Sequence, residues 1–259
     1  MWLFHNLLNL CGVKRMSLYD EFIKEYDDGS LQFNDINYRK GATITASLGL
    51  SNGYREVDGN LEWGYVRIHS GVDRAKLNDL GGPTDIVISP FNFNRSKFID
   101  YNGVVYGSLT SLFNDKYGFE FRIAHMELDK ILILDDLKQE KPIYRDVKIG
   151  TAGDYGLSAG EHTHTEVKSI NEKSEVLEQI LTKKFGDDVN KQYSEQEVLA
   201  YYRTTEKFSG TSNSEILKDW QELKSNRGCL FINKYLYRYI DYDNSQKTRY
   251  STEHLWNGL

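Results

Sequence analysis

The chain has 259 residues, of which 39% are hydrophobic, 27% charged and 13% aromatic. This mixture can bury a core, which excludes a disordered, collagen-like or coiled-coil chain. The 32 Lys and Arg residues and 38 Asp and Glu residues give a net charge of −6, so we expect no binding to nucleic acid. No uninterrupted apolar run of about 18 residues occurs, so we expect no membrane-spanning helix.

The N-terminal segment, residues 1–39, begins with a mostly apolar stretch at residues 2–12. No Lys or Arg precedes this stretch and no small-residue cleavage site follows it, so it makes no convincing signal peptide. We therefore expect a chain made without classical export. Behind it, apolar residues at helical spacing follow Ser17, a capping residue, and predict a short helix over residues 17–26.

Residues 40–168 contain short β-branched and aromatic runs that are separated by Gly and Asn turns. These runs predict strands at residues 42–50, 65–69, 85–88, 103–109, 120–125 and 131–134. Short strands at this spacing indicate an antiparallel β-sheet or sandwich. The fold class that we expect is mainly β, with a separate helical segment near the C-terminus.

That helical segment is residues 169–228, where three Ser residues are each followed three positions later by Glu, at Ser169, Ser194 and Ser212. The spacing is that of a capping box, and apolar residues on one helical face follow each Ser. The pattern predicts three helices, which form an insertion or an extension with a structural or partner-binding role. Residues 229–242 again have the pattern of a β-strand, and residues 249–251 can form a second strand that pairs with them. We therefore expect a C-terminal β-hairpin at 229–259 that packs on the β domain.

Four of the six histidines stand in three places that suggest one site. His69 and Asp73 lie four residues apart, and Gly71 allows the chain to turn between them, so both side chains can reach one ion. His125 ends a strand-like run and can project from a rigid element into a cleft. Taken alone, the first pair also fits two solvated side chains, and His125 also fits a hydrogen-bonded structural histidine.

The third place is the His-x-His motif of His162 and His164. Residues at i and i+2 of a strand share one face, so one imidazole can hold a metal while the other reaches a water bound to it. Glu166 shares this face, where it either supports the ligands or is exposed, and Thr163 and Thr165 face the other side.

Taken in order, these three motifs resemble those of the lysostaphin-type zinc endopeptidases, which cut peptide cross-links in bacterial peptidoglycan. The segments 68–75, 117–126 and 146–167 carry the resemblance, which implies a zinc endopeptidase domain at residues 40–168. It further implies one Zn²⁺ per chain, metal ligands at His69, Asp73 and His164, and catalytic imidazoles at His125 and His162. The family has a bulky apolar residue and an aromatic residue where this chain has Thr163 and Thr165. The resemblance therefore does not extend to the packing on the side of this strand that faces away from the metal.

The chemistry agrees with this resemblance. Two imidazoles and one carboxylate leave a fourth zinc position for water, which is the arrangement of catalytic rather than structural zinc. A nearby imidazole can take the proton of that water and return it to the leaving amine. A second imidazole can stabilise the oxyanion that forms on the carbonyl group.

The sequence also suggests two other interpretations. A Gly-x-Ser-x-Gly sequence at residues 156–160 has the pattern of a serine nucleophile, but no strand-turn-helix context follows it. A non-enzymatic wall-binding or structural virion module could keep the peptidase fold, although such relatives typically lose a ligand and this chain retains all five site residues.

The expected partners are peptidoglycan peptides. Because this substrate lies outside the bacterial membrane, the lack of a convincing signal peptide fits a phage enzyme. This is either a virion enzyme that contacts other tail proteins or a lysin that a separate pore-forming protein releases. The alternative is a bacterial wall-remodelling enzyme in the extracellular or cell-wall space.

Overall fold

The computed structural model describes residues 16–26, 43–46, 48–57, 59–75, 86–158, 160–190, 194–203, 211–227, 229–232, 235–241 and 246–251. Most of the predicted N-terminal segment and residues 252–259 lie outside this part of the chain. Among the described residues, no helix combines the length and the apolar character needed to cross a membrane. The proposed division into segments at residues 40, 169 and 229 stays a prediction.

The described part of the chain forms a nine-stranded antiparallel sheet, which confirms the mainly β fold class. Strand order is β11-β12-β13-β10-β8-β7-β6, and β4 pairs with both β10 and β1. The strands are β1 (Thr43–Ala46), β4 (Val72–Ala75), β6 (Arg95–Asp100), β7 (Ser108–Asn114), β8 (Phe119–Ala124), β10 (Thr163–Ser169), β11 (Cys229–Ile232), β12 (Tyr235–Asp241) and β13 (Lys247–Tyr250).

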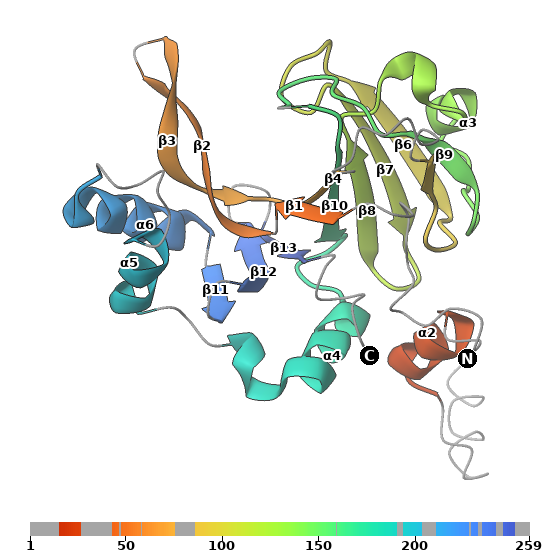
Figure 1. Cartoon of the computed structure of the whole chain (residues 1–259). Coiled ribbons are helices and arrows are strands. Elements are labelled where there is room, and N and C mark those ends of the chain that lie inside the picture. The colour runs from red at the N-terminus through yellow and green to blue at the C-terminus, as the bar shows by residue number, and fades with distance from the viewer. Residues whose placement is uncertain are drawn as a thin grey trace, which may run out of the picture.

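Two smaller antiparallel pairs accompany this sheet. One joins β2 (Gly49–Val57) to β3 (Asn60–His69), and the other joins β5 (Ile86–Ile88) to β9 (Lys148–Thr151). In Figure 1 the long β2–β3 hairpin rises away from the main sheet, and α6 (Asn213–Arg227) contacts β3. Because His69 is the last residue of β3, the hairpin leads the chain directly to the predicted site.

The main sheet has one apolar face and one polar face, as expected for alternating side chains. Phe119, Phe121 and Val167 belong to the hydrophobic core on the first face. Two helices, α2 (Leu18–Tyr26) and α4 (Glu175–Phe185), contact each other and add apolar residues to the same core. The ring of Phe22 in α2 packs edge-on against that of Phe119, with 6.2 Å between centroids.

The three helices predicted after residue 168 are confirmed as α4, α5 (Glu195–Arg203) and α6. At the start of α5, the Glu197 amide donates to Ser194 Oγ at 3.3 Å and the Ser194 amide donates to the Glu197 carboxylate at 2.8 Å. Ser212 and Glu215 make the same reciprocal pair before α6. Ser17 likewise accepts from the Asp20 amide at 3.1 Å at the start of α2.

The predicted cap at Ser169 is wrong. Ser169 is the last residue of β10, and its hydroxyl donates to the carbonyl oxygens of Asn171 and Glu172. The residue that caps α4 is Ser174, which accepts from the Leu177 amide at 3.4 Å. Pairing with β8 extends β10 through residue 169, so the sheet overrides the local capping signal.

Two predicted strands are also corrected. The strand expected at residues 103–109 begins only at Ser108, because Gly103, Val105 and Gly107 have positive φ and form a loop. Residues 131–134 contribute a single bridge at Ile131, and Leu134 already begins α3 (Leu134–Lys138). Two acidic residues in the first turn of α3 favour a helix start there.

The short 3₁₀ helices are η2 (Leu128–Lys130) and η3 (Gly186–Asn190).

The other predicted strands are confirmed. Residues 42–50 contain β1 and the start of β2, residues 65–69 end β3, residues 85–88 contain β5, and residues 120–125 overlap β8 in all but its first residue. In the C-terminal part, β13 pairs with β12 as an antiparallel neighbour and also pairs with β10. The edge of β10 is thereby shared, with β4 along its first half and β13 along its second half.

Candidate metal centre

The site forms where β4 meets β10. In the antiparallel register His164 of β10 lies directly opposite Asp73 of β4, so their side chains share one face of the sheet. His69 ends β3, and Ser70 and Gly71 join that strand to β4. Residues that are 91 positions apart in sequence are thus brought together by one strand pair.

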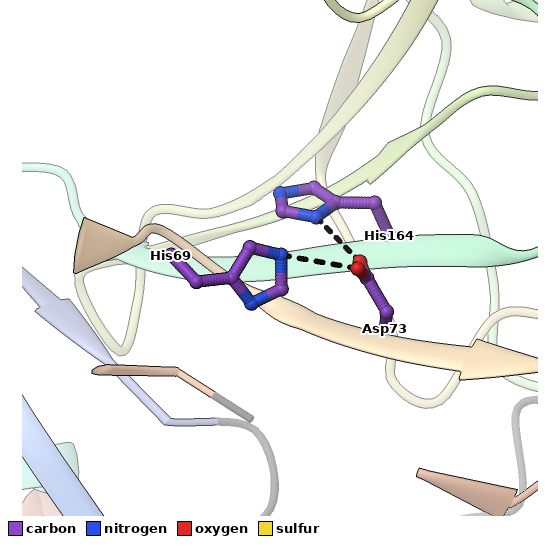
Figure 2. A group of neighbouring side chains, drawn as sticks. All are labelled: His69, Asp73 and His164. Atoms are coloured by element: carbon purple, nitrogen blue, oxygen red, sulfur yellow. Dashed lines mark hydrogen bonds and ion pairs between the residues drawn. The ribbon is translucent and has the colours of Figure 1, made fainter. Parts of the chain in front are cut away.

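Figure 2 shows the imidazoles of His69 and His164 converging on the carboxylate of Asp73. His69 Nε2 lies 3.2 Å from Asp73 Oδ2, and His164 Nδ1 lies 2.8 Å from Asp73 Oδ1. The three ligand atoms all lie within 4.8 Å of one another. Zinc bonds of about 2.0–2.1 Å hold tetrahedral ligands roughly 3.3 Å apart, so this donor set fits one Zn²⁺ after small shifts.

Gly71 permits this convergence. A Cβ atom at this position would overlap the carbonyl oxygen of Thr165 and would lie 2.7 Å from His164 Nε2. The turn between His69 and Asp73 therefore passes so close to β10 that only glycine fits without displacing the imidazole. The sequence indicates that Gly71 allows a turn, and the structure adds that Gly71 lies very close to β10.

The second ring nitrogen of His164 is held by a carboxylate. Its Nε2 lies 3.3 Å from Glu166 Oε1, so donation of Nε2–H to this carboxylate would leave Nδ1 as the nitrogen that gives up its proton to bind a metal. Glu166 is fully buried, so of the two expectations for this residue the exposed side chain is wrong. Four further side chains contact the same carboxylate: Ser70, Tyr106, Arg122 and Arg249.

The electrostatics of the cluster favour ionised carboxylates. Burial opposes ionisation of Asp73, but its contacts with His164 and His69 outweigh burial and lower its pKa well below the usual range. Burial likewise opposes the charge on Glu166, while the charge of Arg249 and the contact with His164 hold its pKa well below normal. In the absence of metal, Asp73 and Glu166 overcome burial and raise the pKa of His164 to about 9.

The two remaining predicted residues lie beside this triad. The ring centroids of His125 and His162 are 4.8 Å apart, and His125 is 5.8 Å from His164. His162 Nε2 lies 3.6 Å from Asp73 Oδ1. The structure therefore brings all five predicted site residues into one cluster, which no single motif could establish.

Main-chain carbonyls select the tautomers of both imidazoles. The Nδ1 of His125 lies 3.0 Å from the carbonyl oxygen of Tyr155, and the Nδ1 of His162 lies 2.8 Å from that of Gly160. A carbonyl oxygen only accepts, so each Nδ1 carries the proton and each Nε2 keeps its lone pair. Burial lowers the pKa of His125 to about 4, so this ring is neutral at pH 7.

Several supporting residues escaped sequence reasoning. Gly107 packs against the Tyr155 carbonyl so closely that a Cβ there would overlap it, and this contact fixes the partner of His125. In the rejected nucleophile pattern, Ser158 donates to the Gly160 carbonyl at 2.7 Å and supports the loop that holds His162. Arg122 lies opposite Glu166 in the β8–β10 register, a pairing that the alternation of both strands could have suggested.

No protein-family profile matches the chain, and no curated protein matches it. Among solved structures, the catalytic domain of the prophage-encoded M23 protein EnpA from Enterococcus faecalis is 18% identical, with 47% of this chain and 81% of that chain covered and a TM-score of 0.32. The catalytic domain of lysostaphin from Staphylococcus simulans is 17% identical, with 50% and 82% covered and a TM-score of 0.34.

A zinc-containing peptidase from Vibrio cholerae is 23% identical, with a TM-score of 0.33, and the match covers 50% of this chain and 36% of that chain. The chain therefore spans about a third of the Vibrio protein's length. Lysostaphin, whose family the three motifs resemble, is thus among the solved structures that the chain matches.

Proposed function

We propose that this chain is a zinc-dependent endopeptidase that hydrolyses peptide cross-links of bacterial peptidoglycan. The observation that carries the proposal is the convergence of His69, Asp73 and His164 on one point, with His125 and His162 beside them. Two imidazoles and one carboxylate are the protein ligands of a catalytic zinc with an open position.

In this proposal His69 Nε2, one oxygen of Asp73 and His164 Nδ1 hold one Zn²⁺ per chain. When bound, the ion supplies a Lewis acid and a water of lowered pKa. The donor types support this assignment, because imidazole nitrogen and carboxylate oxygen are both common zinc ligands. The contact between His164 Nε2 and Glu166 supports it too, since metal-binding histidines usually donate their other N–H to such a partner.

His125 and His162 are the proposed catalytic residues. Each donates Nδ1–H to a main-chain carbonyl and keeps the lone pair of Nε2 free to accept a proton. A neutral imidazole within reach of the attacking water can take its proton, and the resulting imidazolium can return it to the amine that leaves. The other imidazole can contact the carbonyl oxygen as negative charge develops there.

For location, we propose a phage virion (tail) enzyme that works beside other tail proteins, with a bacterial wall-remodelling enzyme as the alternative. The net charge of −6 is compatible with a structural virion component. Mass spectrometry of purified virions and of host envelopes distinguishes the two, because the protein is expected in the virions under the first proposal and only in the envelope under the second.

The activity is tested by digesting purified cell walls of defined cross-link chemistry and analysing the released muropeptides by mass spectrometry. We expect newly cleaved peptide bonds, loss of cleavage after a chelator, and recovery on adding Zn²⁺. A preparation that holds one zinc per chain and leaves every wall intact would instead support a non-enzymatic wall-binding or structural virion module.

A further inference from the structure

Glu166 is a fully buried carboxylate whose two oxygens have different partners. Oε1 faces the metal centre, where it accepts from Ser70 Oγ at 2.6 Å, from the Tyr106 hydroxyl at 3.1 Å and from His164 Nε2 at 3.3 Å. Oε2 faces away from it and accepts from Arg122 Nη1 at 3.2 Å and from Arg249 Nη1 at 2.5 Å. The carboxylate therefore links two guanidinium groups to a proposed metal ligand.

Of the two arginines, Arg249 comes from outside the part of the chain that carries the peptidase motifs. It lies on β13 of the C-terminal hairpin, 83 residues from Glu166, and is itself buried. In the register of β13 and β10, Arg249 lies opposite Lys168, two residues beyond Glu166. The guanidinium of Arg249 on β13 therefore lies on the same face of the sheet as His164.

A buried carboxylate is stable as an anion only when charged or hydrogen-bonding groups compensate it. Guanidinium groups provide strong, directional donors for this purpose. With Oε2 held by Arg122 and Arg249, the carboxylate has a fixed orientation, and Oε1 is aimed at His164 Nε2. That contact fixes the plane of the imidazole and keeps Nδ1 directed toward Asp73.

We propose that Arg249 is a positioning residue of the metal centre, acting through Glu166 on His164, so that the C-terminal hairpin is a structural part of the metal site. This inference rests on the proposed function. It differs from simple packing of the hairpin, because it predicts that one guanidinium, rather than the docking of the hairpin as a whole, controls metal affinity.

The experiment measures the zinc affinity of the full chain by competition with a chromophoric chelator. We expect Arg249→Met to bind Zn²⁺ about tenfold or more weakly than the wild type, in the range found when the partner of a metal-bound histidine is altered. We also expect the visible absorption spectrum of the Co²⁺-loaded variant to differ from that of the wild type, because the coordinating imidazole is reoriented.

Arg238→Met is the matched control. Arg238 lies on β12 of the same hairpin, and its Nε is 3.2 Å from Glu178 Oε1 of α4, away from the metal centre. Loss of this ion pair perturbs hairpin docking without touching Glu166. We expect its zinc affinity to stay within about twofold of the wild type, so equal losses in both arginine variants would overturn the inference.

A double substitution tests whether Arg249 acts through Glu166. Glu166→Gln alone should weaken zinc binding, and adding Arg249→Met should weaken it little further, because the connecting carboxylate is already gone. Should Arg249→Met fail to fold, Arg249→Lys keeps a buried cation without the guanidinium geometry and should weaken zinc binding several-fold. If each substitution instead lowered zinc affinity by its own factor, and the two factors multiplied in the double variant, the inference would be overturned.

The outcomes separate this inference from the proposed function. A wild-type chain that binds no zinc would overturn the proposed function and this inference with it. A wild-type chain that binds zinc, together with unchanged affinity in the folded Arg249 variants, would overturn this inference alone.

Discussion

Gly71 lies directly against the main-chain carbonyl of Thr165, one residue before the strand β4 that pairs with β10. The contact places the turn after His69 against the strand that carries His164. A side chain at position 71 would push these two segments apart. The spacing between the proposed metal ligands therefore depends on a residue that contributes no ligand atom.

Replacing this glycine should weaken metal binding. We expect Gly71→Ala to lower zinc affinity and to destabilise the fold by about 1–3 kcal/mol, because the new methyl group overlaps β10. Zinc titration and thermal unfolding of the variant measure both effects.

Gly118→Ala is a suitable control for that variant. Gly118 has φ +73° and open space around its Cα, so alanine there strains the backbone by about 1–2 kcal/mol without meeting a neighbour. It should lose stability yet keep wild-type zinc affinity. Equal zinc affinities in the two variants would show that the approach of Gly71 to β10 does not set the ligand spacing.

The roles of the histidines can be separated by metal content. His69→Ala and His164→Ala should each purify without zinc, because two ligands hold the ion poorly. His162→Ala should keep one zinc per chain and lose hydrolysis by about 100-fold or more, since only an imidazole beside the ion is removed. Elemental analysis and muropeptide release measure the two properties, and a metal-free His162→Ala beside a zinc-loaded His164→Ala would reverse the assignment.

Lys168 gives the stability of the fold a dependence on pH. Burial, and then the charge of Arg122, lower the pKa of Lys168 from 10.5 to about 8. Between those values the unfolded chain binds more protons than the folded one, so the unfolding free energy contributed by Lys168 rises as pH increases from 8 to 10.5. Below pH 8 the amine is charged in both states and this contribution is constant.

Urea unfolding at several pH values tests this assignment against Lys168→Met, which cannot titrate. We expect the stability of the wild type to improve relative to the variant from pH 8 toward pH 10. A constant difference between the two proteins over this interval would contradict a lowered pKa for Lys168.

The capping boxes predict two localised losses of stability. Ser194→Ala and Ser212→Ala should each destabilise the chain by about 1 kcal/mol, because the amides of Glu197 and Glu215 lose their acceptor. Faster hydrogen exchange should appear in the first turns of α5 and α6. Ser225→Ala, later in α6, is the control and should leave hydrogen exchange in the first turn of α6 unchanged. If a capping variant instead exchanged faster by the same amount along its whole helix, the capping effect would be contradicted.

The proposed metal ligands could be predicted from the sequence because they occur in short motifs with characteristic residue types and spacing. His69 and Asp73 are four residues apart, and His162 and His164 are two residues apart in a stretch with strand pattern, so each motif limits its own geometry. The sequence could not supply the register that places His164 opposite Asp73 across 91 residues, because that register depends on how the whole sheet assembles.

The support of the site was harder to predict for a physical reason. Arginine is usually exposed, and no short motif links Arg249 to Glu166. Their contact requires β13 to occupy the half of the β10 edge that β4 leaves open. The start of a helix was predictable where Ser and Glu cap each other, as at Ser194. The same prediction was wrong at Ser169, because this residue pairs with β8 as part of strand β10.

His125 has φ +68°, in the left-handed region that costs a non-glycine residue about 1–2 kcal/mol. Its amide donates to the Tyr106 carbonyl at 3.1 Å, so the surrounding chain holds it in this unfavourable conformation. Glycine would adopt the same conformation freely, and could yield a protein with a higher melting temperature and no imidazole at this position. Directed evolution for heat resistance alone would thus tend to replace the histidine, so position 125 sets thermal stability against the catalytic role that we propose for its imidazole.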